Sequence, residues 1–209
     1  MLLNSSRDMA TGLGNRNDLV GRYFMSHVAA RGLGTVTLAG PRTKSVTEAI
    51  LDPKFSCIRI KEDVQRRLGL LNHGAVLTRT SEAGLLRGTR RFIRLNRHFA
   101  KYFSGVDDGE TFRLGSLAEQ SPNYDNRVSP GTEMDYTGMK GIKLDFRIND
   151  IDRESIGSSL RFLASELGRL ALGQVRLDFE GTSDLPFEPG EHHMGTTRMH
   201  RDLEAGCGE

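Results

Sequence analysis

The clearest pattern in the chain is a stripe of apolar residues at helical spacing in its last third. Asn149 and Asp150 are both favourable N-cap residues, and Gly173 lies where the periodicity ends. Apolar side chains that recur at steps of three and four residues lie on one face of a helix. The stripe therefore predicts a long amphipathic helix, whose buried face consists of Ile156, Leu160, Leu163, Leu167 and Leu170.

A second stretch of helical spacing runs from Gly88 to Phe103. One face carries Phe92, Leu95, Phe99 and Phe103, and the opposite face carries Arg87, Arg90, Arg91, Arg94, Arg97 and Lys101. A face of six cations can bind phosphate groups or an anionic membrane surface. It is also typical of a solvated outer face, or of arginines that pair with acidic side chains elsewhere. An alternative function for the chain is therefore a binding module that uses this basic helix for anionic partners.

Elsewhere the hydrophobic period changes to two, which is typical of half-buried strands. Strands are predicted at 23–28, 34–38, 58–60, 111–120, 142–148 and 175–179. We expect a turn from Asn126 to Gly141 and a loop without periodicity after Phe187. Strands combined with packed helices predict an α+β fold, with a mixed or antiparallel sheet and helices packed on one face.

Length and composition restrict the class of protein. The chain has 209 residues, of which 37% are hydrophobic and 27% charged, and these values are typical of a globular protein. No run of apolar residues reaches the roughly 18 that a membrane-spanning helix needs, and the opening MLLNSSRDMATG does not have the pattern of a secretory signal. Two cysteines, Cys57 and Cys207, are too few for a disulfide framework or a cysteine-rich zinc module.

The net charge of +2 hides an asymmetry between the two halves of the chain. Residues 1–105 carry 18 Lys and Arg against 7 Asp and Glu, a balance of +11, and residues 106–209 carry 11 against 20, a balance of −9. Because the halves cancel, the molecule as a whole is not a polycation. No nucleic-acid-binding module is recognisable in the sequence, so we expect no nucleic-acid partner.

The richest candidate chemistry lies in the segment from Glu191 to His200, where three of the six histidines fall close together. An imidazole can accept a proton near neutral pH, as a general base must. Gly195 permits close backbone approach to a ligand. Alternatively, the histidines of this segment are only solvated side chains in a polar loop. Glu191, His192, His193 and His200 could also ligate a metal, but their spacing matches no familiar metal motif, and we expect no metal site.

The glycine-rich segments do not supply a nucleotide site. The segment 12–17, GLGNRN, has Asn17 where a dinucleotide loop has its third glycine, and it has neither a preceding strand nor a following helix. The chain also lacks the G-x-x-x-x-G-K-[ST] phosphate loop. The sequence therefore contains no nucleotide fingerprint of its own.

Several separated segments nevertheless resemble one family, the glucose–methanol–choline (GMC) flavin oxidoreductases, and most closely the bacterial sugar and sugar-acid dehydrogenase-like branch. They are LLNSS, GLGNRNDLVGRYFMSH, EQSPNYDNRV, GIKLDFRINDIDRESI and HHMGTTRM, and they follow in the family's order and approximate spacing. The resemblance covers nearly the whole chain. Its most specific parts are GRYFM and HHMGTTRM.

The resemblance implies an FAD-dependent oxidoreductase that acts on the CH–OH group of an alcohol, sugar or polyol, as a dehydrogenase or oxidase. In such enzymes hydride passes to the flavin and a histidine takes the hydroxyl proton. The family's catalytic histidine stands three residues before the glycine of an H-x-x-G-T pattern. That position is His192 here, with Gly195 and Thr196 completing the pattern, and His193 is the second choice.

The resemblance also implies a domain organisation. Residues 1–30 correspond to the junction with a flavin domain, residues 31–187 to the substrate-binding domain, and residues 188–209 to the start of the C-terminal catalytic segment. The family's Rossmann-like FAD domain and its closing flavin-contacting segment have no counterpart here. We therefore expect a fragment that is truncated at both ends, does not bind FAD unaided and is inactive alone, with a separate flavin-domain chain as a possible partner.

Overall fold

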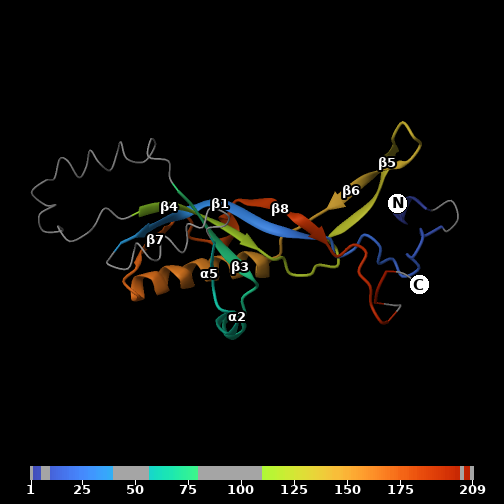
Figure 1. Ribbon diagram of the computed structural model, residues 1–209. Helices are drawn as coiled ribbons and strands as arrows, with labels where there is room; N and C mark the ends of the chain where they lie inside the picture. The colour runs from blue at the N-terminus through green and yellow to red at the C-terminus, as the bar shows by residue number, and fades with distance from the viewer. Residues whose placement is uncertain (1, 6–9, 40–56, 80–109, 203–204, 208–209) are drawn as a thin grey trace, which may run out of the picture. The chain divides into compact units, whose positions relative to one another are not determined.

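A computed structural model describes residues 2–5, 10–39, 57–79, 110–202 and 205–207 of the chain (Figure 1). These residues divide into two compact units. The first unit comprises Met1–His27, Glu119–Asp152 and Pro189–Glu209, and the second comprises Val28–Ala118 and Arg153–Glu188. The basic segment from Arg87 to Lys101 lies outside the described residues, so its predicted helix is not addressed by the structure.

The described strands form one antiparallel, curled sheet and one hairpin. The larger sheet has the order β2-β3-β4-β1-β7, and β8 pairs with β1. Its members are β1 (Met25–Leu38), β2 (Cys57–Arg59), β3 (His73–Arg79), β4 (Glu110–Ala118), β7 (Gly173–Leu177) and β8 (Phe187–Met194). The hairpin consists of β5 (Arg127–Met134) and β6 (Lys140–Asp145).

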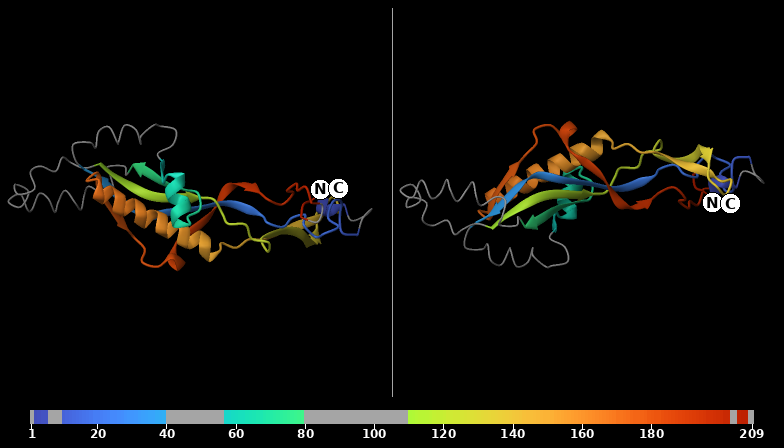
Figure 2. Two further views of the ribbon diagram at one scale, coloured as in Figure 1. Left: turned by 90° about the horizontal axis from the view of Figure 1, so that it is seen from below. Right: turned by 90° about the horizontal axis from the view of Figure 1, so that it is seen from above.

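Two α-helices accompany the strands in the described residues, α2 (Glu62–Leu68) and α5 (Asp150–Arg169), together with the short 3₁₀ turns η1 (Leu2–Asn4) and η3 (Thr182–Asp184). Both views of Figure 2 show α5 running alongside the sheet. The combination of an antiparallel sheet with helices confirms the α+β class in its coarse form. The prediction of α5 is also confirmed, since Ile156 and Leu160 are fully buried and Leu163 and Leu167 nearly so. The inclusion of Leu170 in its buried face is wrong, because α5 ends at Arg169 and Leu170 is 45% exposed.

Several predicted strands occur where expected, but with different bounds. The two strands predicted at 23–28 and 34–38 are one 14-residue strand, β1, whose pairing with β4 shifts register between Ala30 and Gly34. Gly32 and Gly34 interrupt the alternation of apolar residues, and for this reason the sequence pattern indicated two strands instead of one. A Cβ at Gly34 would collide with the carbonyl oxygen of Arg176, so the glycine allows β7 to pair closely with β1.

Three expectations are wrong. The stretch from Asn126 to Gly141 is not only a turn, because it contains β5. The tail after Phe187 is not a loop throughout, because β8 occupies 187–194. The strand at 142–148 is not half-buried, because Ile142 and Leu144 in β6 are 78% and 49% exposed. In the first two cases strand pairing, which the local sequence pattern does not contain, decided the outcome.

The second unit contains a conventional hydrocarbon core. Of the 18 buried hydrophobic residues among those described, 15 belong to this unit. They come from the sheet, for example Val36, Phe112 and Leu114, and from the apolar face of α5. A buried histidine, His73, shares a hydrogen bond with Ser116 (3.0 Å between Nε2 and Oγ), and burial lowers the pKa of His73 from 6.5 to about 4.

The first unit is organised by polar contacts instead. Asn126 is completely buried, its side chain donates to the carbonyl oxygen of Arg147 (3.0 Å), and it accepts from the Arg147 amide (2.8 Å). Asp152, also buried, accepts hydrogen bonds from the amides of Ser121 (2.6 Å) and Asn149 (2.9 Å). Each buried polar group in this network has a partner, as its desolvation requires.

Candidate active site at the histidine segment

Strand β8 lies close to β1 at the position of Gly190. A Cβ at Gly190 would lie 2.7 Å from the carbonyl oxygen of His27 and 2.8 Å from its Cβ, so only glycine lets the two backbones approach this closely. The hydroxyl of Ser26 donates a hydrogen bond to the carbonyl oxygen of Gly190 (2.7 Å). Together these contacts fix the segment that carries His192 and His193 in the first unit.

His192 has an imidazole ring as its neighbour. The centroids of its ring and that of His27 lie 5.2 Å apart, with the planes at 81°, so the edge of one ring meets the face of the other. The side chain is exposed to solvent. The backbone of His192 has φ = 66°, in the left-handed region that few residues other than glycine adopt. Such outliers concentrate at functional sites because the surrounding structure must hold them in place.

His193 has a hydrocarbon neighbour instead. Its ring lies 5.0 Å from that of Phe24, centroid to centroid, at a tilt of 41°. Phe24 is itself buried and meets Phe146 edge to face at 5.8 Å. The rings of the two histidines therefore have different neighbours. His193 packs on an aromatic pair, and His192 faces a second titratable side chain.

The segment after the histidines is folded onto the N-terminal part of the first unit. A Cβ at Gly195, where φ is 98°, would collide with the carbonyl oxygen of Tyr23. The carbonyl oxygen of Thr196 accepts a hydrogen bond from the amide of Gly21 (2.9 Å), and the guanidinium of Arg198 lies 4.1 Å from the Tyr23 ring centroid. The expectation that Gly195 makes room for a ligand is therefore wrong, because the close approach is to the chain itself.

The remaining polar residues of this segment are engaged with their neighbours. Nδ1 of His200 accepts a hydrogen bond from the amide of Asp202 (3.0 Å). Burial raises the pKa of the Cys207 thiol, and the nearby Arg198 opposes that shift. Among the residues that the structure describes, no three His, Cys, Asp or Glu side chains gather into a possible metal site. The four ligands considered for a metal are thus not brought together.

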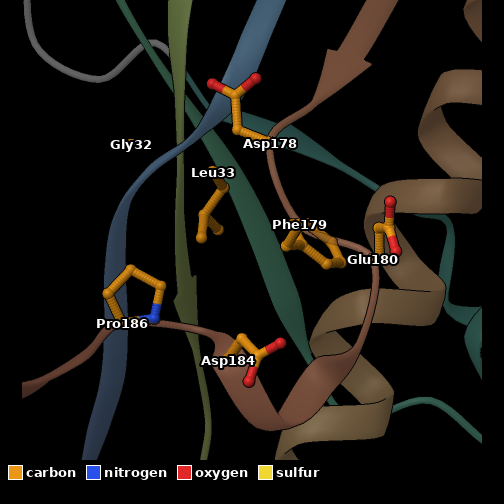
Figure 3. A pocket seen from close by; sticks show the side chains of 7 residues that line it. All are labelled: Gly32, Leu33, Asp178, Phe179, Glu180, Asp184 and Pro186. Atoms are coloured by element: carbon orange, nitrogen blue, oxygen red, sulfur yellow. The ribbon is translucent and has the colours of Figure 1, made fainter.

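The second unit forms a pocket of about 380 Å³ (Figure 3). Leu33, Phe179 and Pro186 supply its apolar lining, and Asp178, Glu180 and Asp184 supply carboxylates. A dinucleotide requires cations or a helix N-terminus for its pyrophosphate, and three carboxylates would repel it. The pocket therefore does not fit FAD. In the first unit, Tyr23 occupies the space beside Gly195 where a Cβ would stand.

The sequence pattern did not point to His27 or Phe24 as neighbours of the histidine pair. His27 lies on β1 and Phe24 directly before it, both more than 160 residues away along the chain, and pairing of β1 with β8 brings them to the site. The resembling segment GRYFMSH contains both residues, so a signal existed, but it did not indicate a role.

The comparisons with known proteins add no assignment. No protein-family model and no curated protein matches this chain. Within the residues described here, no helix is both long and apolar enough to span a membrane.

Proposed function

We propose that this chain is the substrate-binding part of an FAD-dependent oxidoreductase that acts on CH–OH groups of alcohols, sugars or polyols. The observation that supports the proposal is the surroundings of His192. It is exposed, it is held in a left-handed backbone conformation, and it faces the ring of His27. It also occupies the histidine position of the H-x-x-G-T pattern through which the chain resembles GMC oxidoreductases.

His192 is the proposed acceptor of the hydroxyl proton, and His193, whose ring lies against Phe24, is the second choice. A general base must reach its substrate, and both histidines are exposed, but only the ring of His192 lies beside another imidazole among the described ring contacts. His193 lies against Phe24, whose buried ring favours a packing role. The contacts of the two rings thus favour His192 over its neighbour.

When bound, FAD supplies the acceptor for the hydride. The pocket of the second unit does not suit its pyrophosphate, since three acidic residues line that pocket. The proposal therefore includes a separate flavin-binding chain, and the chain by itself is expected to be inactive. What this chain contributes is the substrate-side base and the scaffold that positions it.

The test is co-expression with an FAD-binding domain of the GMC type, followed by dye reduction with a panel of alcohols, sugars and polyols. We expect His192→Asn to lower kcat by about 10²–10⁴, the range for loss of a general base. His193→Asn should cost less than tenfold, and His200→Asn, at a residue whose Nδ1 accepts from the amide of Asp202 in the same turn, is the matched control. Absence of flavin retention and dye reduction for every donor would contradict the proposal, as would full activity of His192→Asn.

A further inference from the structure

The proposed base lies on the surface, where a side chain is ordinarily free to turn. His192 is exposed, and exposed side chains exchange between rotamers within nanoseconds. A general base must lie within hydrogen-bond reach of the proton that it takes, with a ring nitrogen directed at that proton. A neighbour that holds the His192 ring therefore contributes to the reaction, and the ring of His27 lies beside it.

The contact between the two rings restricts orientation as well as position. The ring centroids of His27 and His192 lie 5.2 Å apart, and the ring planes meet at 81°. Such an edge-to-face arrangement is a preferred geometry of aromatic pairs, because the positive edge of one ring meets the negative face of the other. Rotation of the His192 ring would lose this geometry. The ring of His27 thus favours one orientation of its neighbour.

His27 is itself held in place by the strand that carries His192. It is half-buried on β1, and a Cβ at Gly190 would lie 2.8 Å from its Cβ. The backbones of β1 and β8 are therefore in contact at the root of the His27 side chain, just before His192 in β8. The backbone of His192 adds a constraint of its own, because its φ of 66° sets the direction in which the side chain leaves the strand.

A chain of hydrogen bonds fixes the two strands at this point. The hydroxyl of Ser26, the residue before His27, donates to the carbonyl oxygen of Gly190 (2.7 Å). The amide of Ser26 donates to Oε1 of Gln120 (3.3 Å), and Nε2 of Gln120 donates to the carbonyl oxygen of Arg147 (2.8 Å). Ser26 and Gln120 are both buried. Buried hydrogen bonds of this kind specify one arrangement of the backbone, so they support the position of His27.

We propose that His27 is a positioning residue for His192. Its ring holds the imidazole of His192 in the orientation from which that imidazole takes the hydroxyl proton, and this inference rests on the proposed function. Because His27 acts through His192, loss of its ring should slow turnover and leave KM nearly unchanged. A displacement of about 1 Å at a reacting group can lower the rate by about 10². Among the ring contacts of the described residues, neither His193 nor His200 has an imidazole as its neighbour.

The first measurement uses the full chain alone, labelled for NMR, and needs no flavin. In the wild type we expect nuclear Overhauser effects between the ring protons of His27 and those of His192. His27→Ala should shift the ring signals of His192 and increase the mobility of that ring, because it removes the neighbouring ring. His27→Phe keeps an aromatic ring at the position and should leave the mobility unchanged. His200→Ala is the matched control, because it removes an imidazole of the same segment whose Nδ1 accepts from the Asp202 amide. It should leave the His192 signals unchanged.

The second measurement is the kinetics of the complex with an FAD-binding domain of the GMC type. We expect His27→Ala to lower kcat by about 10–100-fold and to change KM by less than about threefold. His27→Phe should bring kcat back to within about threefold of the wild type, because it restores the ring contact without a ring nitrogen. Circular dichroism checks that both variants are folded. The Overhauser effects in the wild type test the ring contact without any variant.

Three outcomes would overturn the positioning role. They are a wild-type spectrum without contact between the two rings, a kcat for His27→Ala equal to that of the wild type, and a loss in His27→Phe as large as in His27→Ala, which would assign the effect to the nitrogens of His27. Failure of the proposed function looks different. In that case the ring contact and its loss in His27→Ala are observed, but the wild-type complex reduces no dye with any CH–OH donor.

Discussion

The second unit is stabilised by buried hydrocarbon, and the first by buried hydrogen bonds. In the second unit an apolar face of α5 and the inner residues of the sheet form the core. Among the described residues of the first unit, three hydrophobic residues are buried, Leu19, Val20 and Phe24, and six polar residues are buried. The hydrophobic effect is the dominant favourable term in folding, so the second unit has the larger source of stability.

This difference shows how a unit can be structured while its apolar side chains remain available. The hydrogen bonds from the Asn126 amide and to the Asp152 carboxylate, both made with backbone groups, specify the backbone path of the first unit without consuming apolar surface. An ion pair between Arg127 and Asp18 adds to this and holds the pKa of the Asp18 carboxyl below its usual value. Large apolar residues of the hairpin, for example Ile142 and Leu144, remain exposed.

The largest effect is expected from the hydrocarbon core. Leu160→Ala, at a fully buried position of α5, should lower the free energy of unfolding by about 3 kcal/mol through lost burial and a cavity. Ile142→Ala, at a position 78% exposed on the hairpin, should change it by less than about 0.5 kcal/mol. Urea unfolding followed by circular dichroism measures both. Equal losses would mean that the hairpin is buried in the folded chain and that the comparison is wrong.

The next largest effect is expected on the pH dependence of stability, through the titration of a buried histidine in the second unit. Because burial lowers the pKa of His73 from 6.5 to about 4, the folded chain keeps this ring neutral while the unfolded chain protonates it. Stability should therefore fall as the pH drops from about 6.5 to about 4, by roughly 3 kcal/mol in total. Urea midpoints at a series of pH values should show this slope in the wild type and lose most of it in His73→Gln. The exposed His200→Gln is the control and should retain the slope.

A smaller and more local effect is expected at the candidate site. Gly195→Ala forces a Cβ onto the carbonyl oxygen of Tyr23 at a positive φ, at a cost of about 1–3 kcal/mol. Hydrogen exchange should increase at 189–199 and stay unchanged at 110–118 in β4. Gly168→Ala, in α5 with open space around it, is the matched control and should be neutral or slightly stabilising. Loss of protection in β4 as well would show that the two units unfold together.

Elements with a strong local signal were predicted, and elements that depend on pairing were not. α5 has an apolar stripe and capping residues within its own sequence, and it occurs as expected. The strands β4 and β7 also follow their predicted ranges closely. In contrast, β5 and β8 carry proline, glycine and charged residues, and they are strands because of the partners they find. In the candidate site, likewise, the sequence pointed to the histidine pair but not to the residues that contact it.

The amino-acid sequence by itself determined the α+β class, the long helix and the segment in which the candidate chemistry lies, because periodicity, capping and side-chain chemistry are local properties. Tertiary structure alone decided that His192 faces His27, that His193 packs on Phe24 and that the hairpin exposes its apolar face. These outcomes depend on strand pairing between residues far apart in the chain. Burial is a property of such long-range contacts, and no local pattern contains it.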